Sequence, residues 1–227
     1  MQSRDRLIVA LDRSSRDDIL ALVDALRGVA GVFKIGLQAF IANGPALVRE
    51  VVAGGERVFL DLKIHDIPNT AGPAVEGAAR LGVAMTTVHA AGGQAMLRAC
   101  ARDDVLILGV TVLTSLDASE LRRIGFSGSP VENAVRLARM SKECGLRGVV
   151  ASPEEIEAIR AECGPEIVIV TPGVRPEGST AGDQRRTKTP AAAIAAGADF
   201  VVVGRPITDA RQPRDAAQRI IESFGGG

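Results

Sequence analysis

Residues 57–90, RVFLDLKIHDIPNTAGPAVEGAARLGVAMTTVHA, contain the pattern that decides the fold. Two short apolar runs, at 57–63 and 85–90, flank a stretch with helical spacing at 70–81. Near-continuous apolar runs of this length are typical of parallel strands that are covered by helices. The segment therefore predicts a strand, a helix and a second strand.

The same alternation extends along the chain in both directions. Further strands are expected at 6–12, 32–36, 106–113, 148–152, 166–172 and 200–205. Further helices are expected at 16–28, 37–53, 93–102, 130–144, 153–163, 189–196 and 213–223. Four of them have a proline near the first helical position, at Ser129-Pro130, Ser152-Pro153, Thr189-Pro190 and Gln212-Pro213. Eight strands alternating with eight helices predict an α/β protein, a single (β/α)8 TIM barrel spanning residues 1–227.

Composition narrows the function classes. The 27 basic residues equal the 27 acidic ones, and aromatic residues make up 3% with no Trp or Tyr, which argues against a nucleic-acid partner. Cys100, Cys144 and Cys163 form an odd set without CxxC spacing, as expected in a reducing compartment. The apolar run at the N-terminus is too short for a signal peptide, and no run approaches the length of a membrane span. We therefore expect a cytoplasmic protein without membrane association.

Polar residues or glycines end nearly every predicted strand. They are Asp12, Lys34 with Gly36, Asp61 with Lys63, His89, Thr114, Ser152, Pro172-Gly173 and Gly204-Arg205. In a (β/α)8 barrel these strand ends converge on one face, where active sites lie. Strand stops and helix caps explain one or two such residues, but not several lysines and aspartates at one rim. The pattern predicts an active site at this face.

Asp61 and Lys63 are two residues apart on a strand, so both side chains should point into the barrel near its mouth. A charged pair in that position is costly unless it has partners. Lys34 is a candidate third member, and Asp66 follows in a loop fixed by Pro68. A structural ion pair would explain Asp61 and Lys63 alone, whereas the larger group favours catalysis.

The last two strands suggest a phosphate site, because barrels often bind phosphate with the loops after strands seven and eight. Gly204 allows close approach of a main-chain N–H, and Arg205 supplies a forked donor. Residues 174–188 form a long polar loop, either a flexible surface loop or a lid whose Gln184, Arg185 and Arg186 close over a phosphate. We therefore expect a barrel of the phosphate-binding type.

His65 and His89 lack metal-ligand spacing, and lysines beside the carboxylates compete with a cation, so no metal and no cofactor are expected. His65 is interpreted as structural. No Ser–His–Asp arrangement accompanies Thr114 or Ser115, which argues against nucleophilic serine chemistry.

These residues closely resemble the bacterial orotidine 5'-phosphate decarboxylase family. The likeness covers FKIG, FLDLKIHDIPNT, TVLTS, TPGVRPEGSTAGDQRR and VVGRPIT, in register from Leu7 to at least Asp209. The Asp-x-Lys-x-x-Asp core also occurs in a wider suprafamily, whereas the Gly-Asp-Gln-Arg-Arg loop with Lys34 is more specific. The resemblance implies a metal-free lyase of pyrimidine biosynthesis that converts orotidine 5'-monophosphate (OMP) to uridine 5'-monophosphate (UMP) and CO2.

The resemblance also implies a role for each site residue. Lys63 would protonate C6 of the pyrimidine, and Asp61 would lie against the substrate carboxylate. Lys34 and Asp66 would complete the charged array, with Asp66 and Thr70 reaching the neighbouring subunit's site in a homodimer. Asp12 and Lys34 would hold the ribose hydroxyls and Thr114 would contact the pyrimidine. The phosphate ligands would be Gln184, Gly204 and Arg205, with Arg175 at the lid.

Two alternatives remain. A metal-dependent hexulose-phosphate synthase or keto-gulonate-phosphate decarboxylase of the same suprafamily would share Asp61, Lys63 and Asp66. It would have Glu in place of Lys34, which argues against it. A non-catalytic sensor of phosphate ligands would need the phosphate grip but not the lysine–aspartate array.

Overall fold

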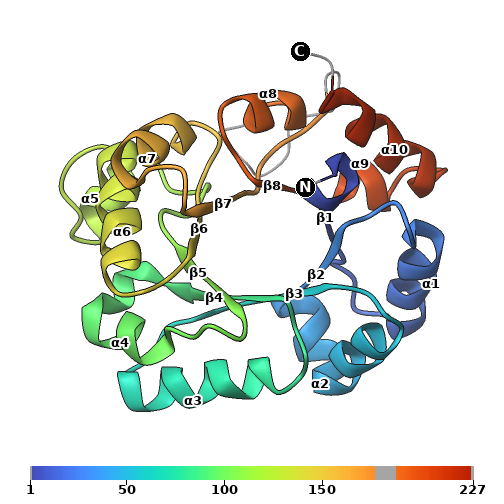
Figure 1. Ribbon diagram of the computed structural model, residues 1–227, viewed down its shortest axis with the longest axis horizontal. Coiled ribbons are helices and arrows are strands. Elements are labelled where there is room, and N and C mark those ends of the chain that lie inside the picture. Colours follow the sequence, from blue (N-terminus) through green and yellow to red (C-terminus); the bar gives the residue numbers. More distant parts are fainter. Residues whose placement is uncertain (1, 177–187, 226–227) are drawn as a thin grey trace.

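The computed structural model describes residues 2–176 and 188–225. Eight parallel strands form a closed barrel in chain order, and helices surround it (Figure 1). The strands are β1 (Leu7–Ala10), β2 (Val32–Gly36), β3 (Val58–Ile64), β4 (Met85–His89), β5 (Leu106–Val110), β6 (Gly148–Val150), β7 (Val168–Thr171) and β8 (Phe200–Val203). Pairing of β1 with β8, with Ile8 opposite Val202, closes the ring. The predicted (β/α)8 fold is confirmed.

Each predicted helix is present, although the bounds differ. The main helices are α1 (Arg16–Leu26), α2 (Leu37–Ala53), α3 (Pro68–Ala79), α4 (Gly93–Cys100), α6 (Pro130–Glu143), α7 (Ile156–Cys163), α8 (Pro190–Ala195) and α10 (Pro213–Ser223). Shorter elements were not predicted: α5 (Ala118–Arg123), α9 (Arg205–Thr208) and the 3-10 turns η1 (Ser3–Arg6) and η2 (Ala90–Gly92). Local caps explain several starts: at α6, Ser129 and Glu132 form a reciprocal capping box after which Pro130 occupies the first turn.

Two helix predictions need correction. Helix α7 begins at Ile156 and not near Pro153, because residues 153–155 form a turn in which the Glu155 N–H donates to the Ser152 carbonyl at 3.1 Å. Helix α2 is interrupted within its span. Gly44 has a φ of 65°, outside the helical region, and Pro45 after it has no N–H to donate to the preceding turn.

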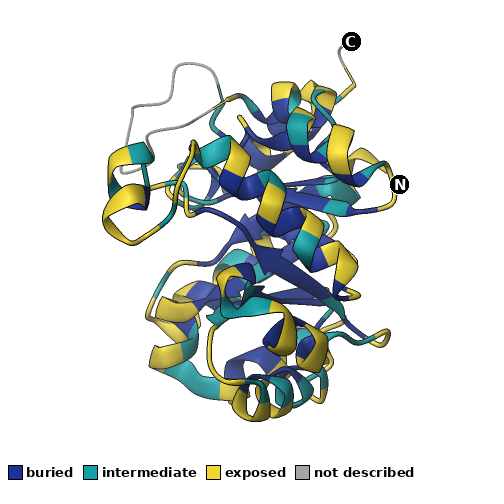
Figure 2. Ribbon diagram, turned by 90° about the vertical axis from the view of Figure 1, so that its left-hand side faces the viewer, coloured by how far each residue is buried: buried dark blue, intermediate teal, exposed yellow. Residues whose placement is uncertain are grey.

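The core has an inner and an outer part. Inside the barrel, Ile8, Phe59, Met85 and Phe200 belong to one buried cluster. A larger cluster lies between the strands and the helices and includes Leu60 of β3. Figure 2 shows the buried residues concentrated on the strands and on the helix faces toward them. The inner packing fills the barrel below its mouth.

No helix in residues 2–176 and 188–225 is long and apolar enough to cross a membrane.

Candidate active site

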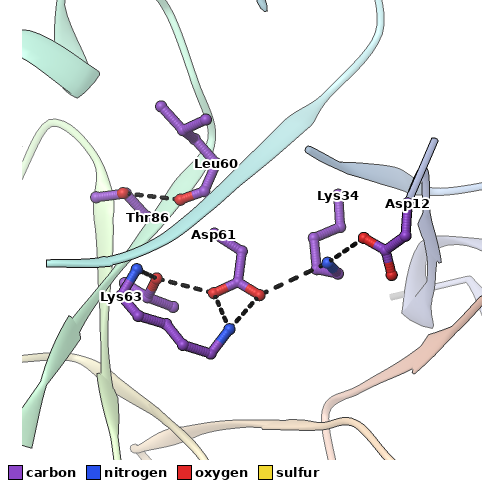
Figure 3. A network of polar contacts seen from close by, with 7 residues as sticks. Asp12, Lys34, Leu60, Asp61, Lys63 and Thr86 are labelled. Atoms are coloured by element: carbon purple, nitrogen blue, oxygen red, sulfur yellow. Dashed lines mark hydrogen bonds and ion pairs between the residues drawn. The ribbon is translucent and has the colours of Figure 1, made fainter. Parts of the chain in front are cut away.

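A continuous chain of alternating charges crosses the carboxyl ends of β1, β2 and β3 (Figure 3). Lys34 Nζ lies 3.1 Å from Asp12 Oδ1 and 3.7 Å from Asp61 Oδ2. Lys63 Nζ donates to both oxygens of Asp61 at 2.8 Å. Asp61 and Lys63 therefore share one side of β3, as the sequence predicts. Leu60 packs on the opposite side, in the outer core.

The main chain of β3 is irregular at Lys63. Lys63 has a φ of 50°, the left-handed region that residues other than glycine seldom adopt. The pairing of β3 with β4 shifts register between Leu60 and Ile64. The Lys63 N–H donates to Thr87 Oγ1 at 2.9 Å instead of to a main-chain carbonyl. Such a conformation costs about 1–3 kcal/mol and persists where the surroundings fix it, often at functional sites.

Asp61 remains ionised although it is only 7% exposed. Burial raises the pKa of its carboxyl, but the charges of Lys34 and Lys63, together with hydrogen bonds from Lys63 and Thr87, outweigh burial and hold that pKa below its usual value. The carboxylate therefore serves as the central anion of the array, with an ammonium group on each side.

The charged chain forms one wall of a cavity of about 490 Å³ at the barrel mouth, within the range of small-molecule sites. Val110, Val112 and Val150, in and near β5 and β6, line an apolar part of it. Thr114 also lines the cavity, beyond the end of β5. The cavity thus offers a charged wall and an apolar wall to one ligand.

The ends of β7 and β8 complete the lining with Arg175, Gly204 and Arg205. Arg205 begins α9, a short extra helix of the kind that phosphate-binding barrels often have after the eighth strand. Arg13, after β1, forms an ion pair with Asp209 and donates to the Thr208 carbonyl at 3.3 Å. These contacts fix α9 to the β1 side of the rim.

Two predicted site residues lie elsewhere, and a third is not among the described residues. Asp66 and Thr70 are exposed and are not part of the cavity lining in this single chain. Asp66 Oδ1 accepts the N–H of Ile67 at 2.7 Å, and Thr70 lies in the first turn of α3. Gln184, with Arg185 and Arg186, falls outside the described residues. Asp12, Lys34, Asp61, Lys63, Thr114, Arg175, Gly204 and Arg205 meet at the cavity.

The histidines lie beside the array. The rings of His65 and His89 are 5.3 Å apart. The pKa of His89 is lowered, first by burial and then by its electrostatic interactions with His65 and Lys63, against the opposing effect of Asp61. Across residues 2–176 and 188–225, no three His, Cys, Asp or Glu side chains are grouped so that they could hold a metal ion.

Two residues that shape the site were missed by the sequence interpretation. Thr87, fully buried on β4, hydrogen-bonds to both Asp61 and Lys63. Gly36 leaves the Lys34 ammonium its place, since a Cβ at this position would lie 2.8 Å from Lys34 Nζ and would displace it. Strand alternation along 85–90 could have identified Thr87, because it places this polar residue on the inward face of the barrel together with Met85. Gly36 was noted only as a strand end.

A closed parallel barrel with a lysine–aspartate array at the carboxyl ends of β1–β3 and arginines after β7 and β8 defines a barrel enzyme of the phosphate-binding class.

Comparison with known proteins narrows this class. Residues 5–220 match the Orotidine 5'-phosphate decarboxylase / HUMPS family. The orotidine 5'-phosphate decarboxylase of Moorella thermoacetica is 53% identical over 97% of this chain and 92% of its own length. That of Heliobacterium modesticaldum is 48% identical over 100% of this chain and 98% of its own length. The crystal structure of the Lactobacillus acidophilus enzyme superposes with a TM-score of 0.86 at 32% identity, covering 97% of this chain and 99% of that one. The chain belongs to the Orotidine 5'-phosphate decarboxylase / HUMPS family.

Proposed function

We propose that this chain decarboxylates OMP to UMP and CO2, the last step of de novo UMP biosynthesis, without a metal ion. The observation that supports this most directly is the Asp12–Lys34–Asp61–Lys63 array, which lines the same cavity as Arg175 and Arg205. The named relatives, two of which are about half identical to the chain, are orotidine 5'-phosphate decarboxylases. They favour this reaction over a metal-dependent hexulose-phosphate synthase or keto-gulonate-phosphate decarboxylase, and over a non-catalytic sensor of phosphate ligands.

Lys63 is the proposed proton donor. Loss of CO2 from C6 of orotate leaves an electron pair in an sp2 orbital that no neighbouring carbonyl can delocalise. Without an electron sink, an enzyme must supply on the order of 20 kcal/mol through preorganised charge, proximity and remote binding energy. An ammonium group held at C6 stabilises the developing charge and then delivers its proton there. The bonds from Nζ to both Asp61 oxygens hold this ammonium in position.

Asp61 has a second role in this proposal. Its carboxylate would lie against the carboxylate of OMP, and the departure of neutral CO2 relieves the repulsion between them. Lys34, on the other side of Asp61, keeps that residue ionised in its buried position. Asp66 from a second subunit would complete the array.

The remaining cavity residues would bind the parts of OMP that do not react. Asp12 and Lys34 would hold the ribose hydroxyls, and Thr114 would contact the pyrimidine. Arg205, the Gly204 main chain and Gln184 would bind the phosphate, with Arg175 beside them at the lid. Binding energy gained at the phosphate, remote from C6, can be used to close and organise the site.

The chemistry of the donor set supports a reaction without a metal. Lys34 Nζ lies 3.1 Å from Asp12 Oδ1 and 3.7 Å from Asp61 Oδ2, so an ammonium group occupies the place between two carboxylates that a divalent cation would need. Its positive charge also opposes a cation nearby.

Three broader proposals accompany the reaction. The whole chain, 1–227, acts as a single decarboxylase domain. It works as a homodimer in which Asp66 and Thr70 serve the partner's site, consistent with their positions outside the cavity of their own chain. It acts in the cytoplasm, a compartment that suits three buried free thiols; burial raises the pKa of Cys100 to about 11 and so makes it unreactive.

Purified protein mixed with OMP in excess EDTA tests the reaction and the absence of a metal together. We expect loss of the orotate absorbance with formation of UMP. Activity that appears only after Mg²⁺ is restored would favour a metal-dependent enzyme of the same suprafamily. Tight UMP binding without turnover under either condition would favour a sensor.

A further inference from the structure

Thr87, on β4, contacts two members of the array, Asp61 and Lys63, from outside the cavity. It is fully buried and is not one of the residues that line the pocket. We propose that Thr87 is a positioning residue whose hydroxyl holds the Asp61 carboxylate and the Lys63 main chain in the geometry that presents the Lys63 ammonium to substrate. This inference rests on the proposed decarboxylation.

The hydroxyl makes both contacts at once. Thr87 Oγ1 accepts the N–H of Lys63 at 2.9 Å and donates to Asp61 Oδ1 at 2.9 Å. A threonine hydroxyl has one donor and two acceptor sites, so these two bonds do not compete. Asp61 Oδ1 also accepts from Lys63 Nζ at 2.8 Å. The main-chain nitrogen and the ammonium of Lys63 are therefore both fixed relative to the same hydroxyl.

The irregularity of β3 at Lys63 makes the Thr87 hydroxyl the hydrogen-bond partner of the Lys63 N–H. Because Lys63 has a φ of 50° and the register of β3 against β4 shifts there, the Lys63 N–H bonds to a side chain of β4. Without the hydroxyl, this N–H loses its partner and Asp61 loses one of its hydrogen bonds. A displacement of about 1 Å in a catalytic group can lower turnover on the order of a hundredfold.

The neighbouring residue supplies a matched control. Thr86 is also on β4 and fully buried, and its Oγ1 donates to a β3 atom, the Leu60 carbonyl, at 2.9 Å (Figure 3). This bond lies on the outer face of the sheet, away from the cavity. Thr86→Val thus removes a buried threonine hydroxyl between the same two strands without touching the array.

The experiment compares Thr87→Val, Thr87→Ser and Thr86→Val with the wild-type chain. For each, kcat on OMP, the Kd of UMP and the thermal unfolding midpoint are measured. UMP lacks the carboxylate that faces Asp61, so its Kd reports on the rest of the pocket. We expect Thr87→Val to lose about tenfold to a hundredfold in kcat with a UMP Kd within about threefold of wild type. Thr87→Ser, which keeps the hydroxyl, and Thr86→Val should each keep kcat within about threefold.

Three results would overturn the proposal: unchanged kcat in Thr87→Val, an equal loss of kcat in Thr86→Val, or no recovery in Thr87→Ser. If Thr87→Val does not fold, Thr87→Cys replaces it, because a thiol is close in size to the serine hydroxyl but hydrogen-bonds weakly. Thr87→Ser must then exceed Thr87→Cys by about tenfold or more in kcat, and equality would refute the role. Failure of the proposed function is a separate result, since the wild-type chain itself would then not turn over OMP.

Discussion

Lys63 shows how one residue depends on contacts distant in the sequence. Strand alternation correctly predicts that Lys63 and Asp61 share a face. It does not predict the φ of 50° at Lys63, because that conformation is fixed by Thr87 on the next strand and by the shift in register between them. A pattern within one segment has no information on such a cross-strand bond. The proposed proton donor is therefore placed by a neighbour that the sequence interpretation did not select.

The ionisation of Asp61 makes part of the protein's stability depend on pH. The pKa of Asp61 is lower in the folded chain than its ordinary value of 3.8, so protons favour the unfolded chain. Its contribution is fully present above that ordinary value and is lost as the pH falls through the lowered pKa. Denaturant unfolding between about pH 5 and pH 2 should show a steeper loss of the free energy of unfolding in wild type than in Asp61→Asn. If the free energy of unfolding fell equally with pH in both proteins, the ionisation of Asp61 would not contribute to the pH dependence of stability.

Arg205 is expected to act on the phosphate. Arg205→Ala should lower kcat/KM on OMP by about a hundredfold or more, because a charged hydrogen bond to phosphate is lost. Activity on the nucleoside orotidine, which has no phosphate, should hardly change. Steady-state kinetics with both substrates makes the comparison, and an equal loss on the two would remove Arg205 from the phosphate site.

At the scale of helices and strands, the sequence predicts the strands and the main helices, but not α5, α9 or the two 3-10 turns. All eight strands and the eight long helical stretches follow from apolar runs and helical spacing. Helix α9 was missed because it has only four residues, too few to show a period, and its Arg205 was included in the predicted strand 200–205. The predicted start of α7 was wrong because residues 153–155 form a turn, closed by the Glu155 N–H on the Ser152 carbonyl.

Gly36, at the junction of β2 and α2, protects the array from steric interference. A Cβ there would lie 2.8 Å from Lys34 Nζ and 3.2 Å from Asp12 Oδ1, so Gly36→Ala should displace the Lys34 ammonium. The φ of Gly36 is −92°, which an alanine can adopt without strain. The substitution should therefore lower activity and not stability. We expect kcat/KM to fall by about tenfold or more with little change in the unfolding midpoint.

Gly77→Ala is the control for this substitution. Gly77 lies in α3 and a Cβ there meets nothing within 4 Å, so this variant should keep full activity. Full activity in Gly36→Ala would show that Lys34 adapts to the added methyl group.

At the scale of the whole molecule, barrel closure brings the site together. Asp12 and Arg205 are far apart in the chain, yet β1 and β8 are neighbours and both residues line one cavity. The expectation that polar strand ends converge is confirmed for most candidate residues, because it depends only on the fold class. Composition and pattern give no information on a subunit interface, and the homodimer stays a prediction from the family resemblance.

Mixing two inactive variants tests the dimer. In the proposed arrangement, a site uses Lys63 from its own chain and Asp66 from the partner. In a heterodimer of Lys63→Ala and Asp66→Asn, one of the two sites is then intact. Random reassociation of equal amounts should restore about a quarter of the sites. Activity assays after co-refolding measure this recovery. Absence of recovery, with dimers demonstrated by analytical ultracentrifugation, would place Asp66 outside the partner's site.

The turnover of OMP by Lys63→Ala tests the central claim most directly. Removing the proposed proton donor should reduce kcat by about 10⁴-fold or more, because general acid catalysis and charge stabilisation are lost together. Binding of UMP should remain measurable and would show that the pocket is intact. Near-normal turnover by Lys63→Ala would contradict the assignment of Lys63 and, with it, the mechanism.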